Sequence, residues 1–390
     1  MDFRLSSELE QFRQEVAAFI ADDMPAGWDD HSLAFEEQLA IERDVMTRLA
    51  KRHWLALPWP AEYGGLGATP LQQLVFNEEI AYHRVPGSVN MGVAWVGPVV
   101  MLYGTDDQKE RYLSRIADGS DLWCTLYSEP GSGSDLASMQ TRAVRDGDEY
   151  VINGQKIWTS FGHYSDWGWL AARTDADVPK HKGLSTFAID MKTPGIEIRP
   201  LYNMAGSHEF NEIFFDDVRI PATQLVGEEN RGWYHVAVGL DFERSSIGAV
   251  SAARRDVDDL LAYVRTGRRG STKLSSMPGV RHLLSDLEIS ANVGRLMAYN
   301  VAWMQNDGGV PTREANMAKL YMAELQQRIH GTALRIAGLP GTLGPGDPGA
   351  AMEGALQFKF LRAVANTIEG GTSEIQRNVI ATRGLGLPRE

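Results

Sequence analysis

Cysteine is nearly absent from the sequence, since Cys124 is the single thiol among 390 residues. One thiol excludes an intrachain disulfide, and no group of histidines and cysteines has the spacing of a zinc site. We therefore expect a chain that holds no metal and is suited to a reducing compartment.

Long hydrophobic runs are missing too. The longest apolar run, residues 91–103, is interrupted by Pro98 and is shorter than the ~20 residues that a membrane-spanning helix needs. The first residues lack the basic start and apolar segment of a secretion signal. These absences favour a cytoplasmic protein with no membrane contact.

Positive charge is in short supply, with 38 Lys and Arg against 51 Asp and Glu and a formal net charge of −13. A basic face for nucleic acid is therefore not expected. An anionic ligand needs a local basic patch. The candidate patch could equally be a solvated face or a subunit contact, and it consists of Arg254, Arg255, Arg265, Arg268 and Arg269.

The hydrophobic pattern changes twice along the chain, and the length allows two or three domains. Residues 1–120 show mostly helical spacing, residues 121–229 show alternating strands without a helical crossover, and residues 230–390 return to helices. We expect an α+β protein with an antiparallel middle domain and a four-helix C-terminal domain. The C-terminal helices are expected at 233–265, 279–306, 312–337 and 351–365.

A loop rich in glycine and serine, residues 128–135 (SEPGSGSD), follows an alternating segment. Such a loop turns backbone N–H groups and hydroxyls toward an anion or an electron-poor ring, although plain connecting loops of this composition are about as common. It is neither a Walker loop nor a dinucleotide fingerprint, because no Gly-Lys-Ser/Thr and no strand–turn–helix surrounds it.

A second segment sharpens this interpretation. Residues 149–152, the dipeptide Asn153-Gly154 and residues 156–160 predict a hairpin that ends in Trp158 and hydroxyls. Trp158 could form the wall that one face of a flavin needs, or it could pack in the core of the domain. Ser128, Ser134 and Ser160 are candidate donors to the edge of such a ring.

These two segments resemble motifs of the acyl-CoA dehydrogenase family of flavoproteins, "TEPxAGSD" and "GxKxWIT", which here read SEPGSGSD and GQKIWTS. The likeness extends to residues 60–67 (PAEYGGLG) and 370–377 (GGTSEIQR). It implies a helical domain, a β-barrel and a helical bundle, with FAD between the barrel and the C-terminal helices. The resemblance assigns FAD contacts to Tyr127, Ser128, Gly133, Ser134, Trp158, Thr159, Ser160, Thr372 and Glu374. It also assigns Ser134 to the substrate.

Dehydrogenation of an acyl thioester needs a base for the α-proton. Val236, Leu240, Glu243, Ile247 and Val250 fall on one helical stripe, so Glu243 is a carboxylate on an apolar face, where desolvation would raise its pKa. A glutamate at the edge of the stripe, paired with a neighbouring arginine, is the alternative.

Many family members carry the base directly before the C-terminal Gly-Thr, where this chain has Gly370, with Glu369 one residue earlier. The long-chain and isovaleryl branches instead place it on the first C-terminal helix before an arginine, which resembles Glu243-Arg244. The resemblance thus favours Glu243 as base and Glu369 as the alternative. It also implies that the N–H of Gly370 polarises the thioester carbonyl and that Arg244 shapes the substrate end of the site.

Two family segments are altered. Residues 265–273 lack the Arg-x-x-Phe-Gly element, and residues 334–341 replace Gln-x-x-Gly-Gly-x-Gly. The chain is similar in this to bacterial dehydrogenases that form heterotetramers, some acting on steroid thioesters. We expect a homotetramer or heterotetramer that oxidises an acyl-CoA and passes electrons to an electron-transferring flavoprotein. A non-catalytic subunit and an oxygen-using flavin oxidase or monooxygenase are the alternatives.

Overall fold

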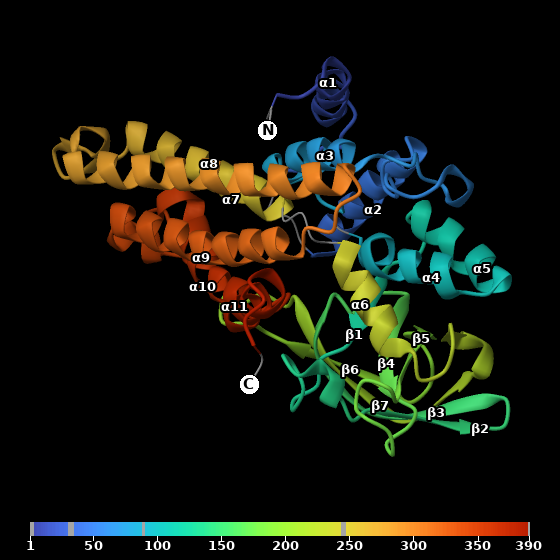
Figure 1. Cartoon of the computed structure of the whole chain (residues 1–390). Coiled ribbons are helices and arrows are strands. Elements are labelled where there is room, and N and C mark those ends of the chain that lie inside the picture. The colour runs from blue at the N-terminus through green and yellow to red at the C-terminus, as the bar shows by residue number, and fades with distance from the viewer. Residues whose placement is uncertain (1–3, 30–34, 88–89, 243–246, 389–390) are drawn as a thin grey trace. The chain divides into compact units, whose positions relative to one another are not determined.

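The computed structural model describes residues 4–29, 35–87, 90–242 and 247–388, with backbone alone for 239–242. The chain divides into two compact units (Figure 1). One unit comprises Met1–Met24, Thr69–Val85 and Arg244–Glu390, and we call it the helical unit. The other comprises Pro25–Ala68 and Pro86–Glu243, and we call it the sheet unit.

An eight-stranded sheet organises the sheet unit, with strand order β6-β7-β3-β2-β4-β5-β8 and β1 paired beside β4. Most neighbours are antiparallel, as predicted, but β1 and β2 both run parallel to β4. In the strand order of the described residues, β6 and β8 are the two edge strands. Closure of the sheet into a barrel therefore stays a prediction. The strands are β1 (Trp123–Leu126), β2 (Arg142–Asp146), β3 (Glu149–Ser160), β4 (Trp167–Arg173), β5 (Leu184–Asp190), β6 (Ile196–Leu201), β7 (Phe210–Pro221) and β8 (Leu225–Val226).

The hairpin predicted at Asn153-Gly154 is wrong, because β3 continues through both residues. The turn lies earlier, at Gly147 between β2 and β3, where φ is +62°. Gly154 instead sits at a register shift between β3 and β7, and a Cβ there would approach the Thr141 hydroxyl oxygen to 2.6 Å. Pairing with a third strand therefore overrides the local turn preference of Asn-Gly.

Helices of the sheet unit pack on Trp123 and Trp169, both buried. A π-helical turn, Gly92–Val96, precedes α4, and Trp59 lies so close to Gly97 that a Cβ there would overlap its ring. Thr105 and Gln108 form a reciprocal cap at the start of α5. The helices of this core are α4 (Gly97–Tyr103), α5 (Asp106–Ala117) and α6 (Gly232–Phe242), and the sheet unit also contains α2 (Phe35–Lys51).

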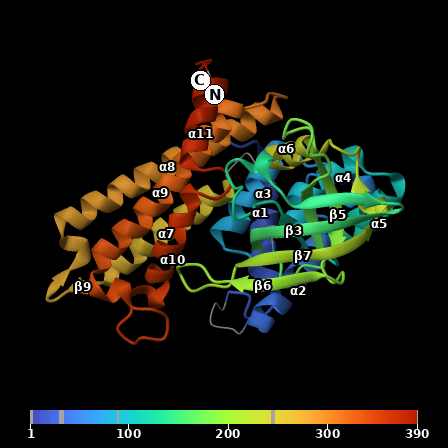
Figure 2. The same cartoon turned by 90° about the horizontal axis from the view of Figure 1, so that it is seen from below.

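The helical unit shares one apolar core that includes Val257, Leu287, Met322 and Ile329. Figures 1 and 2 show α7, α8 and α9 side by side, with α10 along α9. The helices are α1 (Ser7–Asp22), α3 (Pro70–Tyr82), α7 (Ile247–Thr266), α8 (Pro278–Asn306), α9 (Thr312–Ala337), α10 (Ala355–Ala363) and α11 (Ser373–Val379).

The predicted helices at 279–306 and 312–337 agree with α8 and α9 to within one residue. The helix predicted at 233–265 includes residues 243–246, which lie outside the described residues, with α6 before them and α7 after. The contacts place α3 in the helical unit although it lies early in the chain. The division at 1–120, 121–229 and 230–390 stays a prediction.

Within the ranges that the structure describes, every helix is too short or too polar to cross a membrane. The same ranges hold no cluster of three or more His, Cys, Asp or Glu side chains that could bind a metal ion.

A carboxylate ties three helices of the helical unit together. Glu78 of α3 lies 2.6 Å from Arg13 of α1 and 2.5 Å from Arg295 of α8, and it accepts the Tyr299 hydroxyl at 2.6 Å. Burial alone would raise the pKa of Glu78, but the hydrogen bonds from Arg295 and Tyr299 and the two positive charges hold that pKa below its usual value.

We expect Glu78→Gln to lower the free energy of unfolding by about 2–4 kcal/mol, because two arginines lose their buried counter-charge. Urea unfolding at pH 7 measures this loss. Since the pKa of Glu78 is depressed in the folded state, its contribution is complete above the unfolded pKa and is lost as the pH falls through the folded one. The exposed partner of Arg13 supplies the control, Glu10→Gln, which should cost less than about 1 kcal/mol. Equal losses in the two variants would contradict this account.

Candidate functional site

A buried ion pair anchors the loop of residues 128–135. The Lys156 ammonium, on β3 and fully buried, lies 2.8 Å from the Glu129 carboxylate and donates at 3.0 Å to the carbonyl of Tyr127. Glu129 also accepts the backbone N–H groups of Gln140 and Thr141 at 2.6 and 2.9 Å. One carboxylate thus joins both ends of the β1–β2 connection to β3.

Both partners of this pair are charged at neutral pH. Burial lowers the pKa of Lys156 to about 8, against the opposing pull of Glu129. Burial also acts to raise the pKa of Glu129, but the charge and hydrogen bond of Lys156, with the bonds from Thr141 and Gln140, bring that pKa below its usual value.

The loop itself is a tight turn. Glu129 and Ser132 exchange backbone hydrogen bonds at 3.0 Å, and the Ser132 hydroxyl donates to the carbonyl of Asp135 at 2.7 Å. Gly133 and Ser134 are exposed, and a Cβ at Gly133 would meet no described atom within 4 Å. The glycine therefore leaves space beside the loop that no described atom of the sheet unit occupies within 4 Å of that Cβ position.

Trp158 lies at a bulge where β3 slips against β7, with φ at +61°. Its ring is 54% exposed and meets Phe210 edge-on, with centroids 5.6 Å apart. The alternative that Trp158 packs in the core is wrong, because the bulge turns the side chain outward. A left-handed backbone at a bulky residue is rare and marks a position held by its surroundings.

The next residue carries an unused hydroxyl. Thr159 is 1% exposed, and its Oγ1 has no hydrogen-bond partner among the described residues. A buried hydroxyl without a partner is costly, so a ligand that bonds to it would remove that cost. Ser160, one residue on, is half-buried.

The structure joins the two predicted segments, since the N–H of Ile157 donates to the carbonyl of Ser128 at 2.9 Å. Tyr127 is half-buried beside them, and burial raises the pKa of its hydroxyl. The predicted contacts Tyr127, Ser128, Gly133, Ser134, Trp158, Thr159 and Ser160 therefore all belong to these two joined segments of the sheet unit.

The C-terminal candidates belong to the helical unit. Lys319 donates to the carbonyl of Gly371 at 2.6 Å, and Gln376 donates to that of Gly370 at 3.3 Å, which fixes the glycine turn. Thr372 caps α11 through the N–H of Ile375, and Glu374 is exposed in the first turn of α11.

Of the two candidate bases, Glu243 lies outside the described residues, as does Arg244. Two other residues of the predicted apolar stripe are buried. Val236, before the undescribed residues 243–246, is 2% exposed, and Ile247, after them, is 1% exposed. The alternative base, Glu369, is exposed and paired with Arg362 at 3.1 Å. Within the helical unit, this carboxylate therefore already has a cationic partner.

Three arginines of the basic patch considered for an anionic ligand have partners within the helical unit. Arg254 pairs with Asp258 and Arg255 with Asp259. Arg269 donates to two carbonyls at the C-terminal end of α9. These arginines therefore have partners within the helical unit, whereas the sequence suggested a ligand site, a solvated face or a subunit contact.

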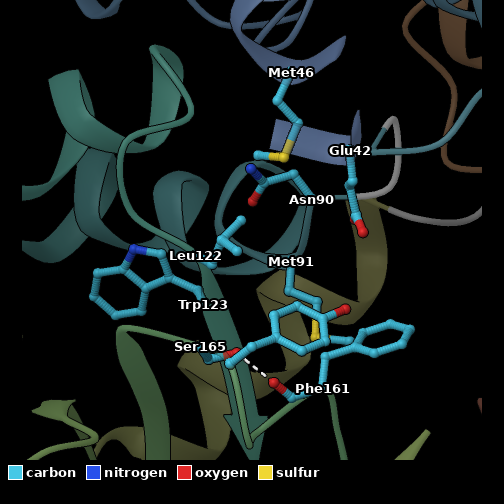
Figure 3. A pocket seen from close by; sticks show the side chains of 9 residues that line it. Glu42, Met46, Asn90, Met91, Leu122, Trp123, Phe161 and Ser165 are labelled. Carbon is cyan, nitrogen blue, oxygen red and sulfur yellow. Dashed lines mark hydrogen bonds between the residues drawn. The ribbon is translucent and has the colours of Figure 1, made fainter. Parts of the chain in front are cut away.

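Figure 3 shows a separate pocket in the sheet unit, lined by residues that include Glu42, Asn90, Trp123 and Tyr164. Burial raises the pKa of Glu42. The cavity volume of about 30 Å³ has room for about two water molecules. It is too small for a flavin or a thioester, which need several hundred cubic ångströms.

A tight glycine-serine loop beside an outward-facing tryptophan and a hydroxyl without a partner among the described residues suits a flat, hydrogen-bonding ring, as in a protein that binds an organic cofactor. The chain belongs to the acyl-CoA dehydrogenase family. Models of the family's N-terminal, middle and C-terminal domains match residues 6–120, 124–218 and 230–385. The protein is thus an oxidoreductase of a FAD-dependent family.

Close relatives agree with this assignment. Acyl-CoA dehydrogenase IpdE1 of Mycobacterium tuberculosis is 37% identical over 395 residues, covering 98% of this chain and 99% of that protein. The solved structure of the Tcur3481-Tcur3483 steroid ACAD matches with a TM-score of 0.90 at 32% identity, over 100% of both chains. The ChsE4-ChsE5 complex from Mycobacterium tuberculosis matches with a TM-score of 0.88 at 34% identity, also over 100% of both chains.

Sequence reasoning missed Glu129 and Lys156 as the anchors of the loop, although both stand inside the quoted motifs. It also missed Asn211, His163 and His208, which surround the end of β3. The signal for the ion pair was a lysine at an inward position of an alternating strand. For the other three, nothing in their local sequence pointed to the end of β3.

We expect Glu129→Gln to lower the free energy of unfolding by roughly 3–5 kcal/mol, because it leaves the Lys156 charge buried and uncompensated. Urea unfolding measures the loss. The matched control is Glu149→Gln, on the strand that carries Lys156, whose exposed pair with Arg219 should contribute less than about 1 kcal/mol. A double variant, Glu129→Gln with Lys156→Met, should recover part of the stability. A Glu129→Gln loss no larger than the control's would show that the pair does not anchor the loop.

Proposed function

We propose that this protein is a FAD-dependent acyl-CoA dehydrogenase that converts an acyl-CoA thioester to the trans-2-enoyl-CoA. The observation that carries the proposal is the unpartnered Thr159 hydroxyl beside the exposed Trp158 ring, on a strand fixed to the glycine-serine loop. The proposal includes the finer architecture, a closed barrel over residues 121–229 and a four-helix bundle over 230–390, and a cytoplasmic location.

The residues present fit FAD. Trp158 offers an apolar ring face, and Thr159 offers a buried hydroxyl that lacks a partner among the described residues. Ser128, Ser134 and Ser160 would donate to the polar edge of the ring system, and Gly133 would let it approach the backbone. When bound, FAD supplies an acceptor for the β-hydrogen of the substrate with its two electrons.

Two further groups of this chain would act on the substrate. Glu243 would remove the α-proton, and the N–H of Gly370 would donate to the thioester carbonyl oxygen, where negative charge develops. The resemblance of Glu243-Arg244 to the long-chain and isovaleryl pattern supports this assignment of the base. The pairing of Glu369 with Arg362 favours Glu243 over Glu369 as the base.

A second chain is part of the proposal. Two of the similar solved structures bear the names of two chains, Tcur3481-Tcur3483 and ChsE4-ChsE5. In this chain, the segment that in the family contacts the flavin of an adjoining subunit is a short hairpin, β9 (Arg268–Arg269) with β10 (Thr272–Lys273). We propose a heterotetramer, a steroid or other bulky acyl-CoA as substrate, Arg244 at its binding end, and an electron-transferring flavoprotein as acceptor.

A half-site subunit is the second candidate function. The altered segments at 265–273 and 334–341 favour it, because members of the resembling family use the corresponding segments for contacts to FAD. Such a subunit would contribute Trp158 or Gly370 to a site without turning over substrate by itself.

We expect Glu243→Gln to keep bound FAD and to lose activity by somewhat more than the roughly 10²–10⁴-fold usual for one acid–base group, because the other candidate carboxylate, Glu369, is paired with Arg362. A panel of acyl-CoA thioesters with an artificial electron acceptor measures the loss. The matched control is Glu369→Gln, which should retain activity within a few-fold. Full activity in Glu243→Gln with loss in Glu369→Gln would move the base.

We expect the chain expressed alone to hold FAD poorly and the chain co-expressed with its partner to hold it fully. The ratio of flavin to protein absorbance measures occupancy in both preparations. Full occupancy and turnover by the purified single chain would remove the reason for a second chain. Rapid reoxidation of the reduced enzyme by air would instead favour the oxidase alternative.

A further inference from the structure

A buried amide lies directly behind the Trp158 bulge. Asn211 of β7 pairs with Thr159 of β3 in the sheet and is 0% exposed. Its side-chain nitrogen donates to the carbonyl oxygen of Thr159 at 3.1 Å. The amide therefore holds the backbone of the residue whose hydroxyl lacks a partner.

The remaining atoms of this amide contact two histidines. The nitrogen of Asn211 lies 3.1 Å from Nδ1 of His163, and its oxygen lies 3.0 Å from Nε2 of His208. A carbonyl can only accept, so the bond to Thr159 fixes which end of the amide is nitrogen. It follows that Nδ1 of His163 accepts a hydrogen bond and that Nε2 of His208 carries a proton.

The two imidazoles stack on each other, with centroids 4.1 Å apart and planes 19° from parallel. Among the described residues, Phe35 of α2 and Tyr164 also contact His163, and Tyr202 contacts His208. Burial lowers the pKa of His163, and the adjacent His208 lowers it further. The arrangement thus requires His163 to be neutral.

The backbone that this network holds is strained on both sides. Trp158 and Phe161 have φ values of +61° and +59°, and both rings are exposed. Such a conformation is energetically unfavourable at a residue other than glycine. The strand end therefore needs interactions that keep it in place, and Asn211 supplies one at the residue between them.

We propose that Asn211 is a positioning residue for the Trp158–Thr159–Ser160 part of the flavin site, and that neutral His163 is required for it to act. The proposal rests on the proposed function for the identity of the ligand. The contact of Asn211 with Thr159 is independent of that identity. Asn211 itself touches neither flavin nor substrate in this assignment.

Protonation of His163 would place an N–H on Nδ1, facing the N–H of Asn211. One hydrogen bond of the amide is then lost, and the amide must turn away from His163. Because the pKa of His163 is lowered on folding, its stabilising contribution is complete above the unfolded pKa and is lost as the pH falls through that value toward the folded one. The hold on Thr159 should weaken in the same direction.

Hydrogen exchange of the FAD-free protein tests the positioning without any ligand. We expect Asn211→Leu to lower the protection factors of residues 158–161 by about tenfold at pH 7.5, the effect of losing one buried hydrogen bond. In the wild type, the same residues should lose protection between pH 7.5 and 5.5. His163→Phe keeps a ring in the stack but removes both the titrating group and the acceptor for Asn211, so it should abolish that pH dependence while its protection lies below that of the wild type at pH 7.5.

The control is Asn153→Leu, which removes the other asparagine that bridges β3 to β7, through Asp217. It should leave residues 158–161 unchanged. If Asn211→Leu does not fold, as judged by circular dichroism, Asn211→Ser removes the same bond with a smaller side chain. Protection within twofold of the wild type in the folded Asn211 variant overturns the proposal, as does a wild-type pH dependence that persists in His163→Phe.

Titration with FAD, in the presence of the partner chain where one is required, then connects the network to the ligand. We expect the Asn211 variant to bind FAD about tenfold more weakly than the wild type and Asn153→Leu to bind it normally. A wild type that binds no FAD would overturn the proposed function, while the exchange measurement still decides the role of Asn211. Equal FAD affinity in the wild type and the Asn211 variant would overturn the positioning role in the flavin site.

Discussion

The charged pair inside the sheet unit, Lys156 with Glu129, is the interaction on which the candidate site depends. A lysine without any exposed surface must have a partner, and this one bonds to a carboxylate and to a backbone carbonyl. Through Glu129 it fixes the loop of residues 128–135, and as part of β3 it precedes the bulge that turns Trp158 outward. The distance between the loop and the bulge is therefore fixed. A ligand that contacts both binds to a surface that is already formed.

The local hydrophobic pattern predicted a helix correctly where the burial of that helix follows the spacing of its own residues. The helical spacing of residues 279–306 and 312–337 gave α8 and α9 because each helix buries a single continuous stripe. It failed at Asn153-Gly154, where the preference for a tight turn lost to pairing with β7, a strand more than fifty residues away in the sequence. The compact units were also beyond local reasoning, because the contacts that place α3 beside α7 and α8 are long-range.

The residues of the candidate site likewise divide into those that the local sequence could predict and those that it could not. The glycine-serine loop and the Trp158 segment could be found from composition and motif, and the structure joins them through Ile157 and Ser128. The exposure of Trp158 could not be predicted, because it depends on the register shift between β3 and β7, which the sequence of β3 alone does not reveal. The role of Asn211 and its two histidine neighbours could not be predicted either, because it depends on the pairing of β7 with β3 at Thr159. The predicted base and its neighbouring arginine fall outside the described residues.

The interleaving of the two units affects how the polypeptide is made. Helix α3 precedes residues 86–243 of the sheet unit in the chain, yet it shares a core with α7, α8 and α9, which follow them. During synthesis its apolar residues lack that core until the later helices appear, and surface exposed in this way promotes aggregation. Shielding of this segment by a chaperone during that interval would therefore raise the yield of folded protein.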